Sequence, residues 1–82
     1  MYWIYVLKST VAAKSYVGHT NDLGRRLEEH SAGRNFYTRR YVPWEMIYTE
    51  QYSGVAEAVQ REKFLKSTQG RRFLKKVFEE QK

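Results

Sequence analysis

Hydrophobic residues recur along this 82-residue chain in short runs whose spacing switches between two and about 3.6 residues. β-branched and aromatic residues fill positions 3–8 and return at 15–19 after a short polar connection, which predicts a β-hairpin. A third extended run, residues 44–52, follows Pro43 and predicts another strand. One face of this strand is expected to hold Trp44, Met46 and Tyr48.

Helical spacing appears in three other segments. The first helix is expected to start at an Asn21 or Asp22 cap and to run to Ser31, with Gly33 just beyond its end. Residues 33–42 have neither period and are expected to form a loop. A second helix is expected over 55–67, and Gly70 is expected to separate it from a third. The third helix would bury Phe73, Leu74, Val77 and Phe78 and end in the polar tail 79–82.

The predicted order is therefore ββαβαα, which is typical of an α+β domain built on a small antiparallel sheet. A chain of 82 residues has room for one such domain, over residues 1–82. Its apolar content of 41% and aromatic content of 16% suffice for a small core. Cysteine is absent, and the sequence shows neither a membrane-spanning run nor a signal peptide. We therefore expect no membrane association and, by default, a cytoplasmic location.

The positive charge points to a polyanionic partner. Fifteen Lys and Arg residues against nine acids give a net charge of +6, which suits nucleic acid but also describes an ordinary solvated basic surface. The cations gather in two segments, one of them interleaved with the aromatic residues of the expected loop. Candidate nucleic-acid contacts are Arg34, Arg39 and Arg40 in the loop, and Lys63, Lys66, Arg71 and Arg72 in the helices.

Three polar side chains fall on apolar helix stripes. Arg26 and His30 share a face with Leu23 and Leu27, although a snorkelling arginine and a helix-terminal histidine would give the same spacing. Glu62 lies on the apolar stripe of the second helix that begins at Val55, where a buried carboxylate costs several kcal/mol unless it is paired or binds a cation. An ion pair with Arg26 or with Lys66 would also satisfy it.

The hairpin adds two tyrosines. If Ile4, Val6 and Val17 face the main core, Tyr5 and Tyr16 emerge together on the opposite face. Cross-strand packing explains such a pair as readily as chemistry does.

In combination these residues resemble the GIY-YIG endonuclease family, over nearly the whole chain. Trp3-Ile4-Tyr5 and Tyr16-Val17-Gly18 stand where the two family triplets belong. Arg26 follows Gly18 by eight residues, and His30 follows Arg26 by four. The segment around Glu62 is similar to the one that carries the family's metal-binding glutamate. The closest likeness is to small standalone members, sometimes described as excinuclease domain-like, which are little more than this domain.

The resemblance implies a three-stranded antiparallel sheet flanked by helices and a divalent-metal-dependent endonuclease that hydrolyses DNA phosphodiesters in repair or recombination. The implied catalytic residues are Tyr5, Tyr16, Arg26, His30 and Glu62. Arg26 would hold the phosphate, Glu62 would bind Mg²⁺ or Mn²⁺, and one tyrosine would activate the water. His30 would sit near the nucleophile as proton acceptor or positioning partner. His19 is a further candidate nucleic-acid contact and occupies a position where some members have lysine.

A second reading is a nucleic-acid-binding module that keeps this site without using it. The sequence contains no recognition module that would select a DNA sequence or shape, so a homodimer or a protein partner would have to supply specificity. DNA is the expected partner, and the sequence leaves RNA open.

Overall fold

A computed structural model of the chain describes residues 1–80. The elements follow in the order β1 (Tyr2–Ser9), β2 (Ser15–Thr20), α1 (Leu23–Ser31), the 3₁₀ helix η1 (Thr38–Tyr41), β3 (Trp44–Tyr52), α2 (Val55–Lys66) and α3 (Thr68–Glu80). The predicted order is confirmed, and the expected loop contains η1. The predicted polar tail starts inside α3, and its last two positions lie outside the described residues.

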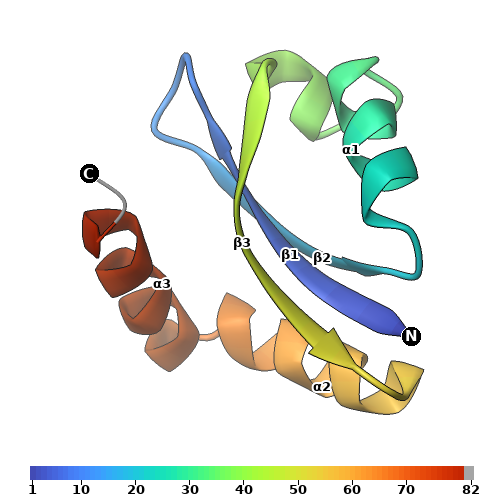
Figure 1. Cartoon of the computed structure of the whole chain (residues 1–82). Helices are drawn as coiled ribbons and strands as arrows, with labels where there is room; N and C mark the ends of the chain where they lie inside the picture. The colour runs from blue at the N-terminus through green and yellow to red at the C-terminus, as the bar shows by residue number, and fades with distance from the viewer. Residues whose placement is uncertain (81–82) are drawn as a thin grey trace.

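The three strands form one antiparallel sheet in the order β2-β1-β3. Helix α1 and η1 lie against one face, while α2 and α3 cover the other (Figure 1). β2 is therefore an edge strand, and side chains from both faces of the sheet can meet along its outer side. None of the helices within residues 1–80 is long and apolar enough to cross a membrane.

Strand alternation divides the core into two clusters, as predicted. Ile4, Val6 and Val17 pack against α2 and α3, where Ala58 and Leu65 are fully buried. On the opposite face the buried residues are Tyr5, Leu7 and Trp44, with Leu23 and Leu27 of α1 packed against them. Tyr5 thus lies within a core cluster, yet on the face that carries the candidate chemistry.

A bulge in β3 corrects one expectation. β1 pairs Val6 with Tyr48 but Leu7 with Met46, so Ile47 is an extra residue in β3. A bulge shifts the alternation of the residues beyond it to the other face. Tyr48 therefore packs with the cluster that lies between the sheet and helices α2 and α3. The prediction that it shares a face with Trp44 and Met46 is wrong.

The helix boundaries also differ from the prediction. The break between α2 and α3 falls at Ser67, whose hydroxyl donates to the Phe64 carbonyl and accepts from the Gly70 amide. Gly70 is buried within α3, where a Cβ atom would run into the Phe64 carbonyl and the Leu65 backbone. Its role is close helix packing rather than interruption. Val55, expected on the buried stripe, is 45% exposed in the first turn of α2.

Candidate active site

Gly18 creates the space in which Tyr5 lies. The two residues face each other across β1 and β2. A Cβ atom on Gly18 would lie 2.6 Å from Cζ of Tyr5 and closer still to its hydroxyl. The missing side chain therefore lets the Tyr5 ring lie across β2, so that its hydroxyl reaches α1. This contact explains why the second triplet ends in glycine.

Helix α1 supplies the two groups that meet the Tyr5 hydroxyl. Asp22 caps the helix by accepting a 3.1 Å hydrogen bond from the Arg25 amide, and Gly33 ends it with φ of 77°. Nε of Arg26 donates to the Tyr5 hydroxyl over 3.2 Å, and Nε2 of His30 lies 3.1 Å from the same oxygen. The predicted face shared by Arg26 and His30 is thus directed at one tyrosine.

The direction of each hydrogen bond follows from elimination. Tyr5 has no exposed surface, so its proton must go to a protein acceptor, and Nε2 of His30 is the acceptor present. The other ring nitrogen of His30 must then carry the ring's proton, and it donates to Oγ1 of Thr38 over 2.7 Å. The four side chains therefore form a hydrogen-bond chain in which each residue donates to the next, from Arg26 through Tyr5 and His30 to Thr38.

Burial keeps Tyr5 and His30 in their neutral forms. Burial raises the pKa of Tyr5 to about 12, against the lowering effect of the Arg26 hydrogen bond. Burial, and then the positive charge of Arg26, lower the pKa of His30 below its usual range. Tyr5 therefore remains protonated and His30 neutral at pH 7, as the hydrogen-bond directions require.

Tyr16 is the tyrosine that reaches the surface. It is half-buried, whereas Tyr5 is enclosed. The Tyr16 ring centroid lies 6.2 Å from that of Tyr5 and 5.0 Å from the His30 ring. The predicted pairing of the two tyrosines on one face is confirmed, and their unequal burial separates a group facing solvent from a group supporting it.

Glu62 approaches from the other face of the sheet. His19 Nδ1 lies 2.6 Å from one carboxylate oxygen, and Lys66 Nζ lies 2.9 Å from the other. Burial acts to raise the pKa of Glu62, but the hydrogen bonds from His19 and Lys66 together outweigh it, so the pKa is lowered and the carboxylate is ionised. The alternative pairing with Lys66 is confirmed, whereas Arg26 instead bonds Glu29 and Tyr5.

Lys66 connects Glu62 to the tyrosines. Its ammonium group lies 6.0 Å from the centre of the Tyr16 ring, on the outer side of β2. β2 is an edge strand, with Tyr16 on one face of the sheet and Glu62 of α2 on the opposite face. Both residues can therefore be reached from the outer side of β2. The five predicted catalytic residues are therefore connected around β2. Contacts on one face of the sheet join Tyr5, Tyr16, Arg26 and His30, and Lys66 joins Glu62 to them. His19 lies among them through its contact with Glu62.

The remaining basic residues separate into groups. Arg39 and Arg40 each place a guanidinium over the exposed Phe36 ring, 4.7 and 5.1 Å from its centre. Lys66 and Arg71 border the same pocket as Tyr16. Residues on other exposed surfaces are Arg34 after α1, Lys63 on α2 and Arg72 on α3. Arg61 of α2 instead forms a two-point ion pair with Glu50 at 2.8 and 2.9 Å.

Two residues of the predicted loop were missed as contributors to the site. Thr38 is fully buried, and its hydroxyl accepts a hydrogen bond from His30. Its carbonyl accepts a 2.7 Å hydrogen bond from the Trp44 indole. Tyr37 lies with its ring centroid 6.1 Å from that of Tyr16. The segment has no regular period, so no sequence pattern marks either residue; the tertiary fold brings them to α1 and β2.

The family is decided by comparison with known proteins. The sequence model of the GIY-YIG catalytic domain matches residues 1–76. This chain belongs to the GIY-YIG family. The GIY-YIG match spans every element described above except the last turn of α3.

Relatives of this GIY-YIG protein include a UPF0213 protein of Natronomonas pharaonis, 39% identical over 80% of this chain and 78% of the relative. A UPF0213 protein of Bacillus pumilus is 40% identical over 74% of this chain and 62% of the relative. The UPF0213 protein of Oceanobacillus iheyensis is 34% identical over 74% of this chain and 71% of the relative. These names state no activity. No solved structure matches the chain.

Proposed function

We propose that this GIY-YIG protein is a divalent-metal-dependent endonuclease that hydrolyses DNA phosphodiesters. The observation that carries the proposal is that two sets of contacts converge on Tyr16. Its ring lies 5.0 Å from that of His30, which Tyr5 links to Arg26, and 6.0 Å from the ammonium group of Lys66, which binds the ionised Glu62. A phosphodiester anion must be neutralised before water can attack it, and this edge offers a fixed guanidinium on one side and a cation-binding carboxylate on the other. The +6 charge of the chain favours approach of the polyanion.

Arg26 is the residue that would bind the phosphate. Tyr5 accepts from its Nε, and Glu29 accepts from Nη1 over 3.2 Å. A guanidinium has five N–H donors, so three stay available for phosphate oxygens. Tyr5, His30 and Thr38 act by holding this guanidinium in place, and pre-positioned donors of this kind stabilise charge that develops in a transition state.

Tyr16 is the tyrosine that would contact the attacking water. Its half-exposed position at the sheet edge allows contact with solvent, which the enclosed hydroxyl of Tyr5 lacks. His30 would act through Tyr5, because both of its ring nitrogens are committed to Tyr5 and Thr38. The two tyrosines thus receive different roles.

The donor set fits a hard divalent cation such as Mg²⁺ or Mn²⁺. Within residues 1–80 no group of three or more His, Asp or Glu side chains is placed to share a metal. Glu62 is the carboxylate that we assign to it. Magnesium sites often have one or two carboxylates and complete their shell with water and phosphate oxygens. When bound, the cation supplies charge neutralisation at the phosphate and leaving oxygen. The ionised carboxylate of Glu62 meets this need, because its oxygens have lone pairs beyond those used by His19 and Lys66.

Cleavage assays with plasmid, branched and damaged DNA, in Mg²⁺ and in Mn²⁺, test the proposal. Arg26→Ala and Glu62→Ala should each lower the rate by at least about 100-fold, because each removes a charge that acts on the transition state. Matched controls are Arg25→Ala and Glu57→Ala, which remove exposed charges from the same two helices. Circular dichroism confirms that the variants fold. The proposal fails if no DNA is cut with either metal, or if both site variants cut as the controls do.

One observation favours a second function, that of a nucleic-acid-binding module with an idle site. Both oxygens of Glu62 are already bonded to His19 and Lys66. If those contacts prevent cation binding, the basic surface would still bind DNA in a salt-dependent manner. Salt-dependent DNA binding that Glu62→Ala leaves unchanged, with no cleavage product, would select this function.

A role in DNA repair or recombination is part of the first proposal and would be tested by sensitivity of a deletion strain to DNA damage.

A further inference from the structure

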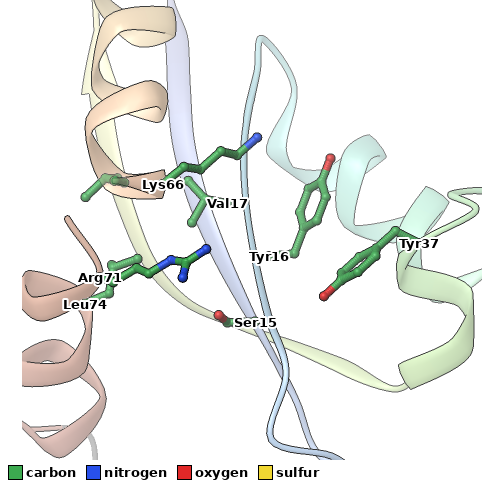
Figure 2. A pocket seen from close by; sticks show the side chains of 8 residues that line it. Ser15, Tyr16, Val17, Tyr37, Lys66, Arg71 and Leu74 are labelled. Atoms are coloured by element: carbon green, nitrogen blue, oxygen red, sulfur yellow. The ribbon is translucent and has the colours of Figure 1, made fainter. Parts of the chain in front are cut away.

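A pocket of about 270 Å³ lies along the outer side of β2, next to the candidate active site. Figure 2 shows Lys66 and Arg71 extending toward β2 from the helical side, opposite the rings of Tyr16 and Tyr37. The remaining lining residues are Ser15, Val17, Leu65 and Leu74. The pocket thus has an apolar floor, an aromatic wall and a cationic wall.

This combination matches the chemistry of one nucleotide. A nucleobase has apolar faces that pack well on tyrosine rings, and Tyr37, with 45% of its surface exposed, presents such a ring. The phosphate attached to the nucleotide requires cations, which Lys66 and the exposed Arg71 provide. Drug-sized ligands occupy pockets of roughly 300–1,000 Å³, so this volume suits a single base rather than several.

The pocket is continuous with the candidate active site through two residues. Tyr16 lines the pocket and also packs against His30, with ring centroids 5.0 Å apart. Lys66 lines it and also binds Glu62 over 2.9 Å. A nucleotide held here would therefore be a neighbour of the phosphodiester at Tyr16, Arg26 and Glu62.

We propose that the pocket binds one unpaired nucleotide that flanks the phosphodiester to be cut. A base inside a duplex is stacked and paired, so it can enter a lateral pocket only after leaving the helix, at a cost of a few kcal/mol. An already unpaired base avoids that cost. The protein therefore selects DNA with an unpaired nucleotide, such as a bulge or flap, over uninterrupted duplex. This inference rests on the proposed function, because it assigns the substrate class of the same site.

Binding without any divalent metal tests the pocket separately from cleavage. The probes are four labelled DNAs of equal length: an uninterrupted duplex, a duplex with one bulged nucleotide, the same bulge without its base, and a single strand. Fluorescence anisotropy in EDTA should show that the base-containing bulge binds about tenfold more tightly than the abasic bulge, since stacking of one base gives roughly 5- to 150-fold. Equal affinity for the two bulges would overturn the inference, as would preference for the duplex.

Variants assign the preference to the pocket. Tyr37→Ala should remove the difference between the two bulges, whereas Tyr37→Phe should keep it because the ring remains. Arg71→Ala should weaken binding of both bulges by a similar factor, through loss of a phosphate contact. Arg25→Ala removes an equal charge from α1, at a position that does not line the pocket, and should leave the preference intact. A preference that survives Tyr37→Ala would overturn the assignment.

Cleavage assays in Mg²⁺ and Mn²⁺ then distinguish the two proposals. Cutting beside the unpaired base, lost in Tyr37→Ala but not in Tyr37→Phe, supports both. Cutting without any preference for an unpaired base overturns the pocket assignment and leaves the endonuclease in place. A base-dependent preference in EDTA with no cutting in either metal overturns the endonuclease and leaves the pocket assignment in place.

Discussion

The Tyr5 hydroxyl donates a hydrogen bond to Nε2 of His30 over 3.1 Å inside the protein. This direction follows because Arg26 donates to the tyrosine oxygen from one side and Thr38 accepts from the far nitrogen of the imidazole. Four side chains from β1, α1 and η1 are therefore linked in a single orientation. The guanidinium at the open end of the chain is the part that a phosphate would meet.

Tyr5→Phe should lower both stability and cleavage. The variant leaves Nε2 of the buried His30 without a donor, which costs about 1–3 kcal/mol in the free energy of unfolding. It also frees Nε of Arg26, so we expect the cleavage rate to fall by about tenfold or more when an oriented guanidinium becomes mobile. Urea unfolding and cleavage kinetics measure the two effects. Tyr41→Phe, on the same face of the sheet, is the control and should change stability by less than about 0.5 kcal/mol.

Thr38→Val should disturb His30 without creating a cavity. The two side chains have nearly the same shape, but valine cannot accept a hydrogen bond from Nδ1 of His30. The unpaired buried donor should lower the free energy of unfolding by about 1–3 kcal/mol. Thr38→Ser keeps the acceptor and should retain the histidine tautomer. Ring-nitrogen chemical shifts of His30 report that tautomer directly. If Thr38→Val leaves both the shifts and the stability unchanged, the assigned orientation of the chain is wrong.

Stability should fall with acidification just below the ordinary pKa of histidine. Burial and Arg26 lower the pKa of His30 in the folded state, so the unfolded chain binds its proton first as the pH decreases. The free energy of unfolding should therefore decline as the pH falls from about 6.5 to the pKa that His30 has in the folded protein. Urea unfolding at several pH values from about 7.5 to about 5 measures the slope, and His30→Gln should flatten it. An equally steep slope in that variant would contradict the assignment.

Gly70→Ala should be strongly destabilising although alanine favours helices. The added Cβ atom would meet the Phe64 carbonyl and the Leu65 backbone, so α3 would have to move away from the end of α2. Overpacking of this kind costs about 1–3 kcal/mol. Gly24→Ala in α1 is the matched control, since its Cβ atom meets only Asp22 Oδ1, 3.8 Å away. That variant should gain up to about 1 kcal/mol from helix propensity. Thermal unfolding of both variants should show shifts of opposite sign.

The hydrophobic pattern predicted the strands and α-helices of residues 1–80, because most of them bury one face at a regular spacing. The predicted face of α1 was confirmed: Leu23 and Leu27 pack against the core while His30 is buried beside them. Pattern could not reveal the bulge at Ile47, because a single extra residue preserves local alternation on each side of it. Nor could it identify Gly70 as a packing residue, since only the approach of α3 to α2 shows what a Cβ atom would strike.

By itself, the sequence determined the order of elements, the two faces of the hairpin and the set of polar residues that lie on apolar stripes, since these depend on local periodicity. The tertiary structure alone decided where those residues lie relative to one another and to solvent. Tyr5 and Tyr16 occupy similar triplets, yet Gly18 lets Tyr5 fold inward while Tyr16 remains at the edge. Thr38 and Tyr37 join the site from an aperiodic segment. Their positions depend on long-range packing against α1 and β2, which no local pattern encodes.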